Sequence, residues 1–190
     1  MNHTPQIKKA IQFAARKHDG HMRMEKEPLP YITHLFSVAL LVAEDGAEDD
    51  VVSAALLHDT IEDTGTTQEE IAKEFNERVA SLVETVSEPK DPELSWRMRK
   101  EHYLAKIEAG PDDALLISLA DKIDNIESKL AAFEREGAEL LKRWKQPLGE
   151  YLWYHSSVLE IAQKRLPDHR LTKRLSEAHA SERKAFGETS

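Results

Sequence analysis

Residues 56–65 read LLHDTIEDTG, a stretch that ends an apolar run with four ionisable side chains inside six residues. Three of the four are carboxylic acids. Charges beside a hydrophobic core are costly unless they are paired or bound to a cation. The stretch therefore indicates a cation site or a reaction centre at the end of a buried element.

The chain on either side of this stretch has the apolar spacing of helices. Residues 51–58 (VVSAALLH) predict a short buried helix, and residues 31–44 predict the helix before it. A first helix begins at Pro5 with Thr4 as its N-cap. We find no internal repeat and no alternating strand pattern, so we predict an all-α fold, a single-domain helical bundle.

Later helices are indicated by capping residues and by prolines. Thr66 and Thr67 each begin a capping box, and Pro147 is either a kink or a boundary in the helical region that starts at residue 138. The last helix is mostly polar and is expected to be peripheral. The predicted helices after the opening stretch cover residues 66–75, 78–86, 95–109, 113–133, 138 onward and 168–185.

Length and composition limit the classes of function. The 190 residues suit one domain, with a motif core over about residues 14–129 and helices of residues 138–186 packing on it. With 35 acidic and 26 basic residues and a formal charge of -9, the chain lacks the basic excess of nucleic-acid-binding proteins. It has no cysteine, no apolar run long enough for a membrane span and no signal peptide. We expect a cytoplasmic protein without nucleic-acid or membrane partners, a monomer or a homodimer.

The acidic stretch needs partners from elsewhere to complete a metal site. Neighbouring His58 and Asp59 diverge inside a helix but converge at a helix end, where imidazole and carboxylate suit Mn, Fe or Zn. His34 in PYITH and Asp121 in the apolar helix ISLADKIDN are candidates for the remaining ligands. A metal held by these four side chains keeps open positions for water and substrate, as a metal hydrolase requires.

The two remaining acids of the stretch are candidates for catalysis. In a helical segment Glu62 lies one turn from His58, and Asp63 lies one turn from Asp59. Both carboxylates then reach a metal-bound water without being ligands. We expect them to position and deprotonate the nucleophile.

The ordered words PYITH, ALLHDTIEDTGTTQEEIAKEF and LADKIDN resemble the HD superfamily of metal-dependent phosphohydrolases. In particular they resemble the small stand-alone alarmone hydrolases among the RelA/SpoT homologues. The resemblance implies an all-helical enzyme that binds one Mn ion and removes the 3′-pyrophosphate of guanosine tetra- or pentaphosphate. It implies the four metal ligands and the catalytic pair named above. It also implies substrate contacts at Arg23, Asn125 and Ser128, and Lys26 and Lys122 are available to meet phosphate.

Several positions depart from the family pattern, so other functions stay open. Histidine replaces glutamine at His21, Asp124 stands in the usual DRLHN segment, and Glu127 stands where an arginine often follows the asparagine. An acidic residue near a polyanionic substrate reverses the local field. The alternatives are an HD phosphohydrolase for another nucleotide (ppApp, NADPH or a nucleoside monophosphate) and a non-catalytic nucleotide-binding regulator. His18 lies on the apolar stripe of the first helix and is expected to be a satisfied core residue.

Overall fold

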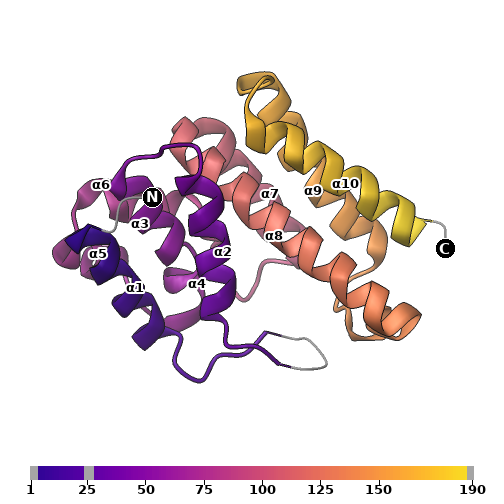
Figure 1. Ribbon diagram of the computed structural model, residues 1–190, viewed down its shortest axis with the longest axis horizontal. Coiled ribbons are helices and arrows are strands. Elements are labelled where there is room, and N and C mark those ends of the chain that lie inside the picture. The colour runs from indigo at the N-terminus through magenta and orange to yellow at the C-terminus, as the bar shows by residue number, and fades with distance from the viewer. Residues whose placement is uncertain (1–3, 24–27, 188–190) are drawn as a thin grey trace. The chain divides into compact units, whose positions relative to one another are not determined.

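The computed structural model describes residues 4–23 and 28–187 (Figure 1). These residues form α-helices and one 3-10 helix, and the only β pairing among them is an isolated bridge between Met22 and Pro30. The all-α prediction is confirmed. The helices are α1 (Pro5–Lys17), α2 (Ile32–Ala43), α3 (Asp49–Leu57), α4 (Thr60–Thr64), α5 (Gln68–Glu74), α6 (Glu77–Thr85), α7 (Trp96–Ala109), α8 (Asp112–Glu136), η1 (Gly137–Arg143), α9 (Leu148–Arg165) and α10 (Arg170–Gly187).

The chain divides into two compact units, Met1–Ser118 and Leu119–Ser190, and the boundary falls inside α8. The first unit holds α1 to α7, and the second holds most of α8 with η1, α9 and α10. The extent of a single domain stays a prediction. No helix in the described part of the chain has the length and apolar character needed to cross a membrane.

The core of the first unit is built around α3. After the two aspartates of its first turn, every residue of this helix from Val51 to Leu57 is buried, and all of these except Ser53 are apolar. Such a helix is stable only inside a core. It packs against α1, α2 and α6. These helices bury α3, which leads directly into His58 and Asp59, the HD pair.

Side-chain caps set several of the helix starts that the sequence predicts. Thr4 accepts a hydrogen bond from the backbone N–H of Ile7, and Thr67 accepts one from Glu70. Each such cap contributes about 1 kcal/mol. Of the two predicted capping boxes, the one at Thr67 begins α5, whereas the Thr66 hydroxyl lies 2.8 Å from that of Thr64.

In the second unit, α9 and α10 pack together as a helical hairpin. Pro147 is the N-cap of α9 and therefore a boundary rather than a kink, and the region just before it is the 3-10 helix η1. The mostly polar α10 nevertheless buries one face. Its buried residues are Leu171, Thr172, Leu175, Ala178, His179, Glu182 and Phe186.

Candidate metal centre and active site

The HD pair lies where α3 ends and α4 begins. His58 is the C-cap of α3 and Asp59 is the N-cap of α4, both with αR backbone angles. At this junction the two neighbouring side chains converge, as expected for a pair at a helix end, and His58 Nε2 lies 3.2 Å from Asp59 Oδ2. The short α4 then ends at Gly65, whose φ of 72° is the left-handed conformation that glycine adopts readily.

The hydrogen bond of His58 Nδ1 determines which nitrogen of the ring faces Asp59. His58 Nδ1 lies 2.8 Å from the carbonyl oxygen of Ala55. A carbonyl only accepts, so Nδ1 carries a proton, and Nε2 is the ring nitrogen that faces the Asp59 carboxylate. An imidazole nitrogen and a carboxylate oxygen at this distance are both groups that bind divalent cations. The arrangement therefore fits a divalent metal ion.

A second imidazole from α2 approaches the same carboxylate. His34 Nε2 lies 3.6 Å from Asp59 Oδ2, and the His34 and His58 rings meet edge to face with centroids 5.1 Å apart. Both histidines are buried, whereas the Asp59 side chain keeps 18% of its surface exposed. Two imidazole nitrogens and a carboxylate oxygen that solvent partly reaches match the donor set of a hydrolytic metal centre.

Tyr31 is a residue of this centre that the sequence did not single out. Its hydroxyl donates a 2.7 Å hydrogen bond to Asp59 Oδ2, which orients the carboxylate. The available signal was its position three residues before His34, on the same side of the chain entering α2.

The two acids of α4 have environments that favour proton transfer near neutral pH. Burial, with the nearby carboxylates of Asp59 and Glu88, raises the pKa of Glu62 to about 7. Partial burial, with the charge of Asp59, also raises the pKa of Asp63. A general base works best when its pKa lies close to the working pH, so Glu62 has the properties of one.

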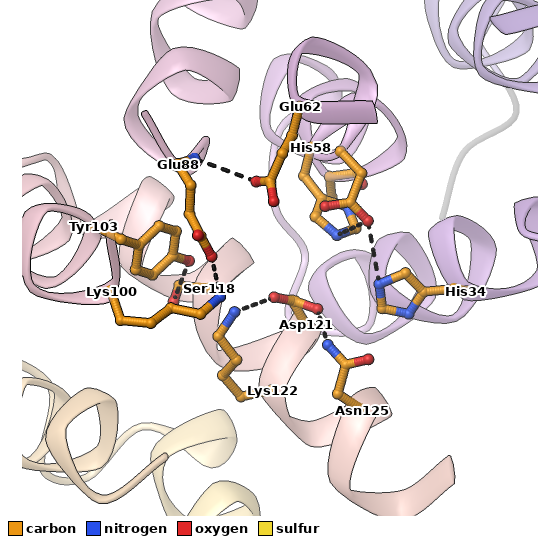
Figure 2. A network of polar contacts seen from close by, with 12 residues as sticks. His34, His58, Glu62, Glu88, Lys100, Tyr103, Ser118, Asp121, Lys122 and Asn125 are labelled. Atoms are coloured by element: carbon orange, nitrogen blue, oxygen red, sulfur yellow. Dashed lines mark hydrogen bonds and ion pairs between the residues drawn. The ribbon is translucent and has the colours of Figure 1, made fainter. Parts of the chain in front are cut away.

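Figure 2 shows the polar contacts that surround Glu62. The backbone N–H of Glu88 donates to Glu62 Oε2 at 3.2 Å, and the Glu88 side chain is paired with Lys100. Arg99 Nε lies 3.6 Å from the same Glu88 carboxylate. Glu88 follows α6 in a proline-containing loop, and no periodic pattern in the sequence pointed to it.

The loop before α2 holds two of the predicted substrate contacts. The backbone N–H of Arg23 donates to the carbonyl of Leu29 at 2.8 Å, and its side chain is half-buried. Lys26 lies outside the described residues. His21 is exposed.

His18 is buried as predicted, and its ring stacks on Tyr31 with centroids 5.2 Å apart. Among the described residues neither of its ring nitrogens has a hydrogen-bond partner, so the prediction of a satisfied core histidine is wrong in that respect. Burial lowers the pKa of His18 to about 4, which keeps the ring neutral.

The other predicted site residues lie on α8 in the second unit. Lys122 and Asn125 both donate to the Asp121 carboxylate (Figure 2), and the Lys122 ammonium lies 4.9 Å from the centroid of the Tyr154 ring. Ser128 is half-buried on the same helix. The meeting of Asp121 with the His34, His58 and Asp59 side chains stays a prediction.

Glu127, which departs from the family pattern, has a structural partner. Arg174 on α10 donates to both of its carboxylate oxygens, from Nε at 3.0 Å and from Nη2 at 2.9 Å. A bidentate pair of this kind neutralises the carboxylate locally. The exchange to glutamate therefore does not leave an uncompensated negative charge on α8.

Known proteins resemble this chain over most of its length. Residues 10–145 match the HD domain family. A MESH1 protein of Xenopus tropicalis, named guanosine-3′,5′-bis(diphosphate) 3′-pyrophosphohydrolase, is 37% identical over 157 residues, which are 81% of this chain and 83% of that protein. A protein of Aquifex aeolicus with the same enzyme name is 39% identical over 143 residues, or 74% of this chain, but the match spans only 20% of that longer relative.

One solved structure is described as a metazoan orthologue of SpoT that hydrolyses ppGpp. It matches with a TM-score of 0.78 at 25% identity, over 95% of this chain and 97% of that one. A family match over most of the sequence, together with a relative aligned along most of its own length, shows that this chain belongs to the HD domain family, as a hydrolase of the MESH1-related group.

Proposed function

We propose that the protein is a Mn²⁺-dependent hydrolase that removes the 3′-pyrophosphate from ppGpp and pppGpp in the cytoplasm. The observation that carries the proposal is the convergence of two imidazole nitrogens on Asp59, beside a Glu62 carboxyl whose pKa is about 7. The enzyme names of the MESH1 and Aquifex relatives support the choice of substrate.

The proposed metal ligands are His34, His58, Asp59 and, from the second unit, Asp121. Imidazole and carboxylate donors suit Mn²⁺ among several divalent ions. When bound, the ion supplies Lewis-acid activation of water and shields phosphate charge. The Tyr31 hydroxyl and the Ala55 carbonyl support this proposal, since each holds one of the ligands in a fixed orientation.

The proton transfer is proposed to belong to Glu62. Hydrolysis adds water across the ester bond at the ribose 3′ oxygen, so that ppGpp gives GDP and pyrophosphate. Ionised Glu62 accepts the proton of the attacking water, and Asp63 orients that water from one residue further along α4. The backbone N–H of Glu88 supports this role, because its hydrogen bond orients the Glu62 carboxyl group.

The substrate is proposed to contact Arg23, Lys26, Lys122, Asn125 and Ser128. The protein carries a net charge of -9, so a polyphosphate needs positive charge close to its binding site. Arginine binds phosphate through two parallel hydrogen bonds, whereas lysine acts as a point charge. We therefore expect Arg23 to contribute most of the phosphate affinity.

The test is to incubate the purified protein and Mn²⁺ with a panel of nucleotides and to identify the products by chromatography. The panel holds ppGpp, pppGpp, ppApp, NADPH and nucleoside monophosphates. We expect GDP and pyrophosphate from ppGpp, with the Asp59→Ala protein as the inactive control.

Two outcomes would overturn the proposal. Release of inorganic phosphate from NADPH or a monophosphate, with ppGpp left intact, would assign the centre to another phosphoester. Binding of a nucleotide without turnover of any would identify a regulator.

A further inference from the structure

A second group of imidazole and carboxylate side chains lies between α9 and α10, within the second unit. His155 comes from α9, and His179 and Glu182 come from α10. His155 Nδ1 lies 2.8 Å and 3.0 Å from the two Glu182 oxygens, and His179 Nδ1 lies 3.0 Å from Oε2. One donor atom from each residue falls within 4.8 Å of the others.

All three side chains of this group are buried. Glu182 has no exposed surface, and His155 and His179 keep only 2% and 6% of theirs. A buried carboxylate is stable only when paired with hydrogen-bond donors or with a cation. The buried Glu182 carboxylate therefore depends on its two imidazole partners or on a cation. None of the three residues takes part in the proposed hydrolysis.

Burial and hydrogen bonding shift the pKa values of two members of this group, His155 and Glu182. Burial lowers the pKa of His155 to about 4, so its ring is neutral at physiological pH. Burial disfavours the charged form of Glu182, but the hydrogen bonds from both imidazoles outweigh burial and lower its pKa to about 2.

We infer that His155, His179 and Glu182 form a second metal site, which takes a divalent ion of the zinc class and links α9 to α10. Two imidazoles and one carboxylate are a known donor set for zinc. The site uses His179 and Glu182 three residues apart on one helix face, a spacing that recurs in metal sites of helical bundles. Mg²⁺ and Ca²⁺ are disfavoured, since they take oxygen ligands.

The distances require little rearrangement. Donor atoms bound to one tetrahedral zinc ion lie roughly 3.3 Å apart, given zinc–ligand bonds of about 2.0–2.2 Å. The hydrogen-bonded distances between each Nδ1 and the carboxylate are a few tenths of an ångström shorter. On metal binding each imidazole carries its proton on Nε2 instead of Nδ1. The ion then occupies the place of the two Nδ1 hydrogens, and each ring stays neutral.

The experiment counts zinc ions per chain by mass spectrometry after equilibrium dialysis. It compares the wild-type protein with H179Q, with the pair H58Q and D59N, and with all three changes together. We expect two ions in the wild type, one in H179Q, one in the H58Q and D59N protein, and none in the triple variant. H102Q is the matched control, because His102 is an exposed histidine of α7 outside both groups, and it should bind two.

The proposal is overturned if H179Q binds as many ions as the wild type, or if the H58Q and D59N protein binds none. In either case the group is a hydrogen-bonded cluster alone. The proposed hydrolysis is judged separately by turnover of ppGpp, since a failure at His179 leaves the HD pair intact.

A second measurement needs no variant and so does not depend on variants folding. Crystals of the zinc-loaded wild-type protein should show an anomalous scattering peak between the Glu182 carboxylate and the Nδ1 atoms of His155 and His179. A peak at the HD pair with none between α9 and α10 would contradict the inference.

Discussion

The described residues hold two groups of two imidazoles and a carboxylate, one in each unit, and the groups differ in how open they are. At the HD pair the Asp59 side chain is 18% exposed, and it also accepts the Tyr31 hydroxyl. At the α9 and α10 group the carboxylate of Glu182 is fully buried and faces both imidazoles through their Nδ1 atoms.

This difference separates a centre suited to turnover from one suited to holding helices together. A reaction needs positions that water and substrate reach, together with a base of suitable pKa nearby, and Glu62 supplies that base beside Asp59. A buried carboxylate that is hydrogen-bonded to residues of two helices instead stabilises the packing of those helices. The same residue types therefore give opposite expectations for activity and for stability.

The strongest test of the comparison is Asp59→Ala. Loss of a ligand should remove the metal and its transition-state stabilisation, which is worth several kcal/mol, so kcat/KM should fall by about a thousandfold or more. Steady-state hydrolysis of ppGpp and metal analysis of the same sample measure both effects. Turnover at the wild-type rate in this variant would show that the HD pair is not the reaction centre.

Glu62→Gln should separate metal binding from chemistry at the same centre. The amide keeps the size of the side chain but accepts no proton, so kcat should fall by about a hundredfold to ten-thousandfold, the usual contribution of a general base. Metal content should stay as in the wild type. A variant that lost the metal as well would place Glu62 among the ligands instead.

Glu182→Ala should affect stability rather than chemistry. In a metal-free buffer it leaves two buried imidazole N–H groups without their acceptor, which should lower the free energy of unfolding by about 3 kcal/mol. Urea denaturation followed by circular dichroism measures this change. Glu177→Ala is the matched control, because Glu177 is exposed on the same helix, and it should stay within about 0.5 kcal/mol of the wild type. Equal effects of the two variants would mean that the buried group contributes no stability.

Most of the fold could be predicted from the sequence, because helix starts depend on local chemistry. Thr4, Thr67 and Ser95 each cap a helix through a side chain that accepts from a backbone N–H three residues later. Such short-range signals can be recognised in the sequence without knowledge of the tertiary structure. The 3-10 helix η1 was missed, since residues 137–143 have the apolar spacing of an ordinary helix.

The two groups differ in the same way in how far sequence reveals them. His58, Asp59 and Glu62 are close in the chain and form a recognisable sequence motif, and His34 belongs to a second motif. The pairing of His155 with Glu182 depends on α9 packing against α10, which no local pattern encodes. Only the spacing of His179 and Glu182 on one helix face was visible, and it lies in a segment that otherwise looks polar.

The smallest expected effect concerns the charge balance around Glu62 and is tested by Lys100→Met. Burial, Asp59 and Glu88 raise the pKa of Glu62, whereas the ammonium of Lys100 lowers it. Without Lys100 the pKa of Glu62 should rise above about 7. Since Glu62 must be ionised to accept a proton, the acidic limb of the kcat profile should move to higher pH, with the loss confined to low pH and full activity recovered at high pH.

The matched control for this shift is Lys106→Met, on the same helix. Lys106 pairs with Glu84 and is not among the charges that shift the pKa of Glu62, so its removal should leave the acidic limb in place. A metal ion held at Asp59 would lower the pKa of Glu62 in all three proteins, so the difference between them would keep its sign. An acidic limb that stays fixed in Lys100→Met would assign the titrating base to a group other than Glu62, and the HD pair would then lack the feature that distinguishes it from the buried group of α9 and α10.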